Sequence, residues 1–202
     1  MKILKIASRG NASNTFLVTA DGVNAVVIDP CSPFVLSPLE HLGLEYKVVL
    51  LTHGHFDHVG GCAALQSIGA DIYCNEREKE LIFSPQYLGL FGGVTVPEFE
   101  VTHTFKDGDE LNLYGLSFKV MHTAGHSAGS SCFVLGNALF TGDTLFKGGV
   151  GRTDLYTGSF SELVKSVKRL YALDGDYTVY CGHGDDTTLD SERKNNPFVR
   201  WG

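Results

Sequence analysis

The chain contains 202 residues, of which 43% are hydrophobic, and its formal net charge at pH 7 is -7. This length and composition suit a single domain spanning residues 1–202, whereas the negative charge argues against a nucleic-acid partner, which needs a basic surface. No apolar run approaches the roughly 20 residues of a membrane span, and residues 1–6 are too short for a signal peptide, so we expect a cytoplasmic protein with no membrane partner. The cysteines are odd in number and include no CxxC pair, so we expect neither a disulfide framework nor a thiolate zinc site.

The first half of the chain is predicted to alternate strands with helices. Strands are expected at residues 14–19, 24–28, 47–51 and 70–74. Helices are expected at 34–42 and 59–68. The pair Asp21-Gly22, typical of tight hairpin turns, joins the first two strands. In the second helix we expect Leu65 and Ile68 to face the core.

The second half is predicted to contain mainly strands, followed by two helices. Strands are expected at residues 110–113, 117–121, 131–135, 138–140 and 177–181. Ser159 and Glu162 form a capping-box pattern that begins a helix reaching Tyr171, and a last helix at 189–194 stops before Pro197. Such segregated strands and helices favour stacked sheets with helices outside. The irregular segment 84–97 is predicted to be a mobile flap beside the functional site.

The strongest functional signal is the heptapeptide THGHFDH at residues 52–58, which directly follows the apolar run at 48–51. It offers four potential metal ligands, His53, His55, Asp57 and His58. Isolated histidines usually need no metal, but three of the eight histidines fall here, and imidazole and carboxylate are the donors that a zinc-like ion prefers. Residues two apart in an extended segment project to the same side. The heptapeptide therefore predicts a metal site.

Three later segments repeat this theme, because each places a ligand-type side chain in a glycine-rich turn next to a predicted strand. They are HTAGHS at 122–127, FTGDT at 140–144 and CGHG at 181–184. Convergence of such turns at one sheet edge builds a site for more than one metal ion, which a structural protein would not need.

The motifs THGHFDH, HTAGHSAG, FTGD and CGHG resemble the ordered ligand motifs of the metallo-β-lactamase superfamily. The likeness is greatest to its glyoxalase II-like (hydroxyacylglutathione hydrolase-like) members and covers essentially the whole chain. The resemblance implies an α+β fold, the four-layer αββα sandwich with metals at the sheet edges. It assigns His53, His55 and His126 to one metal and Asp57, His58 and His183 to a second, with Asp143 bridging.

Within HTAGHSAG, His126 rather than His122 matches the family ligand, and His41 and His103 match none of these motifs. We expect His122, at a strand end, to pack near the site without binding metal, and His41 and His103 to face solvent.

This arrangement predicts a hydrolase, since two cations about 3.5–4 Å apart share a hydroxide that is nucleophilic at neutral pH. Two zinc ions are expected, with iron or manganese as alternatives, and the natural substrate is a small ester or thioester such as an acyl-thiol. Asp57 is the candidate catalytic residue, either orienting the hydroxide or taking its proton.

The glycine-rich loop 146–154 carries two candidate substrate-binding cations. Lys147 and Arg152 are each placed to meet a substrate carboxylate, and the alternative is that Arg152 pairs with Asp154 and simply holds the loop. Two departures from glyoxalase II argue against tight glutathione recognition: Asp185 stands in place of a substrate-binding tyrosine, and we expect no counterpart of that family's helical C-terminal domain after the last motif.

Two other functions stay open at this point. One is a persulfide dioxygenase with a single Fe(II) on ligands such as His53, His126 and Asp143, since two histidines and a carboxylate form the usual non-haem iron face. The other is a metal-stabilised binding protein without turnover. β-Lactam hydrolysis is less expected, because the Asp57-His58 pair is more like the thioester and phosphodiester branches. The oligomeric state is not predicted.

Overall fold

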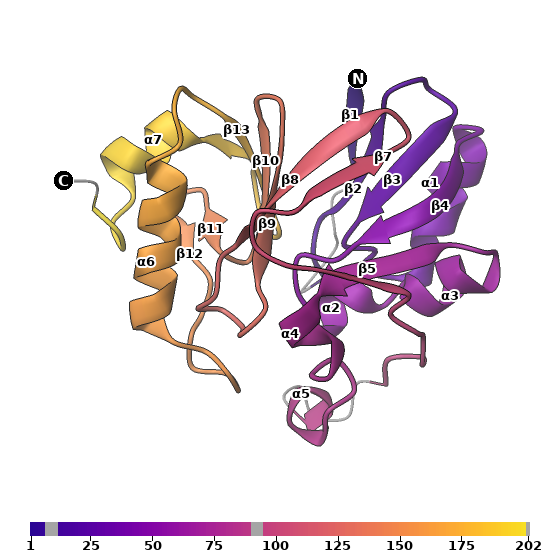
Figure 1. Cartoon of the computed structure of the whole chain (residues 1–202), viewed down its shortest axis with the longest axis horizontal. Coiled ribbons are helices and arrows are strands. Elements are labelled where there is room, and N and C mark those ends of the chain that lie inside the picture. Colours follow the sequence, from indigo (N-terminus) through magenta and orange to yellow (C-terminus); the bar gives the residue numbers. More distant parts are fainter. Residues whose placement is uncertain (7–11, 90–94, 201–202) are drawn as a thin grey trace.

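The computed structural model describes residues 1–6, 12–89 and 95–200. They form two six-stranded sheets that pack face to face, with helices on both outer sides (Figure 1). This is the α+β, four-layer αββα sandwich expected from the motifs. No helix in the described part of the chain is long and apolar enough to span a bilayer.

The first sheet is built from the N-terminal half in strict chain order. Its strands are β1 (Lys2–Ile6), β2 (Thr15–Thr19), β3 (Asn24–Ile28), β4 (Glu45–Leu50), β5 (Asp71–Asn75) and β6 (His103–Phe105). The first three strands pair antiparallel, and β3 to β6 pair parallel through helical crossovers. The parallel strands β3, β4 and β5 therefore all end at the same edge of the sheet.

The second sheet belongs to the C-terminal half and is again mixed. In spatial order it contains β14 (Thr187–Thr188), β13 (Thr178–Cys181), β10 (Ala138–Gly142), β9 (Ser131–Leu135), β8 (Leu116–His122) and β7 (Glu110–Leu113). Only β10 and β13 pair parallel. A small separate ribbon joins β11 (Leu145–Phe146) and β12 (Gly149–Val150).

The helices cover the outer faces of the sheets. Those on the N-terminal side are the 3-10 helix η1 (Pro33–Val35), α1 (Leu36–His41), α2 (Phe56–Val59) and α3 (Cys62–Ser67). On the C-terminal side are α6 (Phe160–Tyr171) and α7 (Leu189–Asn195), while α4 (Glu76–Lys79) and α5 (Pro85–Gly89) follow β5 (Figure 1). The Ser159 side chain accepts from the Glu162 amide, which confirms the predicted N-terminus of α6.

Three hydrophobic layers hold the sandwich together, and strand alternation creates them. Along β2, Phe16 and Val18 face the second sheet, whereas Leu17 between them faces the helices of its own side. Buried residues of β8, β9 and β10 complete the central layer, and α6 and α7 close the third. Because side chains alternate along a strand, each sheet presents one apolar face to its neighbour sheet and one to its helices.

The helix predicted at 59–68 differs from the structure, because a glycine pair divides it into α2 and α3. A Cβ on Gly60 would lie 2.4 Å from the carbonyl oxygen of Cys31, and one on Gly61 2.6 Å from that of Ser32. The preceding turn thus packs directly on the glycine backbone. The expected inward position of Ile68 is wrong, since α3 ends at Ser67 and the Ile68 side chain is 49% exposed.

Short edge strands escaped the sequence analysis. These strands are β1, β6 and β14, which have five, three and two residues and lie at the sheet edges. Edge strands are less buried, so their sequences show only a weak alternation of apolar and polar residues. In the predicted flap, α5 forms a short helix; residues 90–94 lie outside the described residues. The hairpin turns at 20–23, 114–115 and 136–137 lie at the end of the sheets opposite to the ends of β3, β4, β10 and β13.

Candidate metal centre

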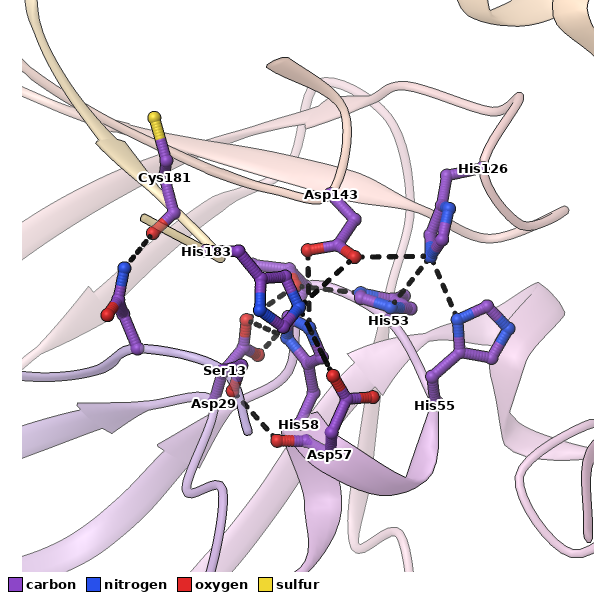
Figure 2. Close-up of polar contacts among 12 residues, drawn as sticks. Ser13, Asp29, His53, His55, Asp57, His58, His126, Asp143, Cys181 and His183 are labelled. Atoms are coloured by element: carbon purple, nitrogen blue, oxygen red, sulfur yellow. Dashed lines mark hydrogen bonds and ion pairs between the residues drawn. The ribbon is translucent and has the colours of Figure 1, made fainter. Parts of the chain in front are cut away.

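The seven predicted ligands come together at one edge of the two sheets (Figure 2). Four of them, His53, His55, Asp57 and His58, lie on the segment after β4 and on α2. The other three follow strands of the second sheet: His126 lies in the loop after β8, Asp143 follows β10, and His183 lies two residues after β13.

Asp143 and His183 are neighbours because β10 and β13 run parallel. An irregularity in the register between Phe140 and Gly142 precedes Asp143, and the Gly182 amide donates to the Gly142 carbonyl at 2.9 Å. A Cβ on Gly182 would lie 2.3 Å from Oδ1 of Asp143, so the turn has no room for a side chain. The glycines of FTGD and CGHG therefore allow the two strand ends to approach closely.

His53, His55 and His126 form a buried cluster, called here the three-histidine group. Nε2 of His126 lies 3.2 Å from Nε2 of His53 and 2.9 Å from Nδ1 of His55. Two ligands bound to zinc at tetrahedral angles are separated by about 3.3 Å. The 3.2 Å separation matches this value and the 2.9 Å separation is shorter, so the nitrogens lie close enough together to bind one cation.

Hydrogen bonds set which nitrogens of this group face inward. Nδ1 of His126 lies 2.8 Å from the Arg152 carbonyl oxygen, an acceptor only, so Nδ1 carries the proton. Nδ1 of His53 contacts Oγ1 of Thr52 at 3.1 Å, and that hydroxyl already donates to Asp29. The Nε2 electron pairs of His53 and His126 therefore point at each other, which favours a shared cation.

Asp57, His58 and His183 form a second cluster, called here the mixed group. Nε2 of His183 lies 3.1 Å from Oδ2 of Asp57, and Nε2 of His58 lies 3.8 Å from the same oxygen. This group is more open, because the His183 side chain is 32% exposed.

Asp143 lies between the two groups. Oδ1 is 3.3 Å from Nε2 of His58, and Oδ2 is 3.5 Å from Nε2 of both His126 and His183. Oδ1 and the His58 Nε2 are buried, and apart from this contact neither has a hydrogen-bond partner in the described part of the chain. Such buried polar atoms are explained by a cation, and the carboxylate is placed to contact one ion from each group.

The two groups differ in electrostatics. Burial lowers the pKa of His55 to about 3 and also holds the pKa of His53 well below its usual range. Burial alone would lower the pKa of His183, but the carboxylates of Asp143 and Asp57 raise it to about 9. Burial likewise opposes ionisation of Asp143, yet the neighbouring His58 keeps the pKa of its carboxyl far below the usual value.

Asp29 is a functional candidate that the sequence analysis missed. Its carboxylate accepts from Nδ1 of His58 at 2.8 Å and from the Thr52 amide and hydroxyl. It thereby orients His58 directly and His53 through Thr52. The backbone of Asp29 itself has a φ of 50°. The only available signal was its place at a strand end, just before Pro30.

A cavity of about 360 Å³ opens beside the ligands. It is lined by His55, Phe56, Asp57, His126, Asp143, Phe146, Arg152, Leu155 and His183. Arg152 therefore reaches the cavity, and its guanidinium also makes two 2.7 Å hydrogen bonds to Asp154, the loop-holding contact considered above. Lys147 is not among these lining residues and pairs with Asp185 at 3.1 Å on the surface.

Among the described residues, the remaining histidines belong to neither the three-histidine group nor the mixed group. Nε2 of His122 contacts the Ala128 carbonyl at 2.8 Å, close to the site, as expected for a packing residue at the end of β8. His41 and His103 are exposed, and His103 stacks on Tyr73.

A model of the metallo-beta-lactamase superfamily matches residues 8–183 of this chain. Among curated proteins, hydroxyacylglutathione hydrolase GloC of Haemophilus influenzae is 38% identical over 195 residues, which cover 92% of each chain.

Solved structures of the same fold resemble this chain closely. The B3 metallo-beta-lactamase BLEG-1 has a TM-score of 0.92 at 29% identity, covering 98% of this chain and 99% of its own. TTHA1623 in a di-iron-bound form gives 0.82 at 34% identity, covering 97% and 100%. ETHE1 from Myxococcus xanthus gives 0.80 at 28% identity, covering 98% and 84%.

Proposed function

Because this chain belongs to the metallo-beta-lactamase superfamily, we propose that it is a metal-dependent hydrolase of a small thioester or ester, with an acyl-thiol as its substrate class. The observation that carries the proposal is the convergence of seven histidine and aspartate side chains beside an open cavity. The 38% identity to GloC, named as a hydroxyacylglutathione hydrolase, supports the thioester among the alternatives.

We propose that His53, His55 and His126 hold one metal ion, that Asp57, His58 and His183 hold a second, and that Asp143 contacts both. Zinc is the proposed metal, because the donors are imidazoles and carboxylates; iron or manganese is the alternative, as a di-iron form of a 34% identical neighbour indicates. When bound, the pair of ions supplies an activated water and a Lewis acid for the substrate carbonyl.

The protein residues around the cavity then have separate tasks. Asp57 faces the cavity beside His183, where its carboxylate is placed to orient the attacking water or hold its proton. Phe56, Phe146 and Leu155 offer apolar walls for an acyl group, and they limit access of bulk water.

The two loop cations have unequal positions as substrate contacts. Arg152 lines the cavity, so it is the stronger candidate to bind a substrate carboxylate, in exchange for Asp154. Lys147 lies further out, and we propose it for the distal end of a longer substrate. We also propose a single domain that acts on small molecules in the cytoplasm without a membrane partner, and the net charge of -7 supports the absence of a nucleic-acid partner.

A substrate panel on metal-reconstituted protein tests this proposal. Metal-free protein loaded separately with zinc, manganese and ferrous iron is assayed with S-lactoylglutathione, other thioesters, simple esters and a β-lactam. We expect thioester turnover with zinc and a loss of at least about 100-fold in Asp143→Ala, since metal contacts stabilise the transition state by several kcal/mol.

The matched control is Asp71→Ala, which removes an exposed aspartate at the start of β5 and is expected to keep full activity. Absence of thioester and ester hydrolysis with every metal would reject the proposed function. Turnover of the β-lactam alone would replace the thioester or ester with a β-lactam as the substrate class.

A second candidate is a persulfide dioxygenase with one Fe(II), the alternative that the sequence motifs left open. The Nε2 atoms of His53 and His126 and the Asp143 carboxylate lie together, as a two-histidine, one-carboxylate iron face requires. Oxygen consumption with glutathione persulfide distinguishes this function from hydrolysis. A protein that binds metal but turns over neither substrate would be the third alternative, a binding protein.

A further inference from the structure

Glu78 is a fully buried acid on α4 that belongs to none of the ligand groups. Its carboxylate lies between two loops that are more than 70 residues apart in sequence. One loop carries His53 and His55, and the other carries His126. A buried carboxylate is costly to desolvate, so its retention calls for a structural or functional reason.

The two oxygens of Glu78 are divided between these loops. Oε2 accepts from the Gly54 amide at 2.9 Å. Oε1 accepts from the Gly129 amide at 2.8 Å and from the Ser127 hydroxyl, and the Tyr87 hydroxyl lies 3.4 Å away. Each neighbouring group is a donor, which matches an ionised carboxylate.

The residues that Glu78 contacts alternate with the proposed ligands along the chain. Gly54 lies between His53 and His55, and Ser127 directly follows His126. The carboxylate therefore contacts the backbone between His53 and His55, the side chain of the residue after His126 and, through the Gly129 amide, the backbone three residues after His126.

The packing around Glu78 also accounts for two glycines of the motifs. A Cβ on Gly54 would lie 2.8 Å from Oε2 of Glu78, and a Cβ on Gly129 would lie 2.5 Å from its Cγ. Side chains at either position would push the acid away from the amides it accepts from. The glycine in THGHFDH and the last glycine in HTAGHSAG thus fit the presence of this acid.

We propose that Glu78 is a positioning residue that sets the distance between the His53–His55 loop and the His126 loop, and so the metal affinity of the three-histidine group. This inference rests on the proposed metal-binding role of that group. The mixed group has other supports, because Ser13 donates to the Asp57 carbonyl and Asn14 to the carbonyls beside His183. The effect of Glu78 is therefore specific to one of the two groups.

The conservative variant Glu78→Gln tests the proposal, because the amide has nearly the same shape but only one acceptor oxygen. If that oxygen replaces Oε1, the NH2 group faces the Gly54 amide, and two donors then oppose each other. If the amide is flipped, the conflict moves to Gly129 and Ser127. Either way one loop loses its partner.

Glu192 on α7 provides the matched control. It is 2% exposed and accepts from the Gly148 amide, the Thr187 hydroxyl and the Asn196 side chain, none of which adjoins a proposed ligand. Glu192→Gln makes the same chemical change in a similarly buried network. Comparing the two variants separates an effect on metal binding from a general loss of stability.

The measurement is zinc affinity by competition with chelators of graded strength, together with the melting temperature of each metal-free protein. We expect Glu78→Gln to weaken zinc binding at one of the two groups by about 10–100-fold, the usual effect of losing a partner behind a metal ligand. Glu192→Gln is expected to lower the melting temperature without changing zinc affinity by more than about twofold, since its contacts lie away from the ligands.

Wild-type zinc affinity in Glu78→Gln overturns this inference, as does an equal loss in Glu192→Gln. If Glu78→Gln does not fold, Ser127→Ala keeps the acid buried and removes one donor beside His126; it is expected to weaken zinc binding by about tenfold, and an unchanged affinity counts against the proposal. Zinc binding with no hydrolysis would reject the proposed hydrolase and leave this inference standing, whereas a wild-type protein that binds no zinc would reject both.

Discussion

The three-histidine group and the mixed group use similar donors in opposite surroundings. The first is buried and consists of imidazoles whose neighbours include other imidazoles, so proton binding is disfavoured at His53 and His55. In the second, Asp57 and Asp143 surround His58 and His183 and favour their protonated forms. The comparison teaches that residue type alone does not set the protonation of an imidazole, and any cation bound by the mixed group would compete with the protons of His58 and His183.

The supports behind the two groups differ as well. Glu78 holds the backbone of the three-histidine group, while Ser13 and Asn14 hold that of the mixed group. Asp29 serves both, because it accepts from His58 and, through Thr52, orients His53. Substitutions at Glu78 or Asn14 are therefore expected to affect one group and spare the other, whereas a substitution at Asp29 would reach both.

Titration of the metal-free protein is the sharpest way to break this comparison. We expect His55 to stay neutral down to about pH 3 and His183 to stay protonated up to about pH 9, a difference of 9 − 3, or about 6 pKa units. Ring resonances followed by NMR measure both values. Titration of both rings near the ordinary value of 6.5 would remove the electrostatic difference.

The same shifts give the sign of the stability change in the metal-free protein. Below pH 6.5 His55 binds a proton in the unfolded chain but stays neutral in the folded protein. Protonation therefore favours the unfolded chain, and the free energy of unfolding decreases as the pH falls from 6.5 towards 3. Folded His183 binds its proton more tightly than the unfolded chain, so its contribution is complete below 6.5 and is lost as the pH rises to about 9.

Removing one histidine from each group sharpens the comparison next. His126 is 3% exposed, and its loss is expected to weaken zinc binding by about 100-fold, since a zinc site of about 10–16 kcal/mol is shared among roughly four ligands. For His183→Ala we expect about tenfold, because a water molecule replaces an imidazole that is 32% exposed.

Chelator competition measures both affinities, and His122→Ala serves as the control. That variant removes a nearby histidine outside the ligand groups and is expected to bind zinc normally. Equal losses in His126→Ala and His183→Ala would show that burial does not distinguish the two groups.

The smallest expected effect concerns the support of the mixed group. Asn14 donates to the carbonyls of Cys181 and Gly184 at 2.9 and 3.0 Å, on either side of His183. We expect Asn14→Ala to weaken zinc at this group by up to about tenfold and to spare the three-histidine group, with the exposed Asn112→Ala as control. Chelator competition measures both variants. A loss at the three-histidine group instead would contradict separate supports.

The sequence indicated the fold and the ligand candidates because their signals are local. Three histidines and an aspartate share one heptapeptide, and the glycine-rich turns follow strands whose alternation is clear. The structure brings all seven candidates together, and their roles as ligands stay predictions. Family membership and the αββα fold are confirmed.

What the sequence did not indicate depends on contacts between distant residues. Asp29 meets Thr52 23 residues away, and Glu78 meets Gly129 51 residues away, so no spacing rule relates them. The break between α2 and α3 likewise comes from the Cys31 carbonyl packing on Gly60, which helical periodicity does not contain. Ile68 was expected in the core because the predicted helix includes it, whereas α3 ends at Ser67 and Ile68 no longer lies on the helical face of Leu65.

The hairpin turn at 136–137 lies at the end of the sheets opposite to Asp143 and His183. Gly136 has a φ of 58° there, and apart from its two chain neighbours no residue of the described part of the chain comes within 4 Å of the place where its Cβ would be. The molecule therefore offers an attachment point for a foreign peptide, a fluorescent label or a surface tether that is remote from the reactive edge. A protein immobilised through this turn would present its cavity to the surrounding solution.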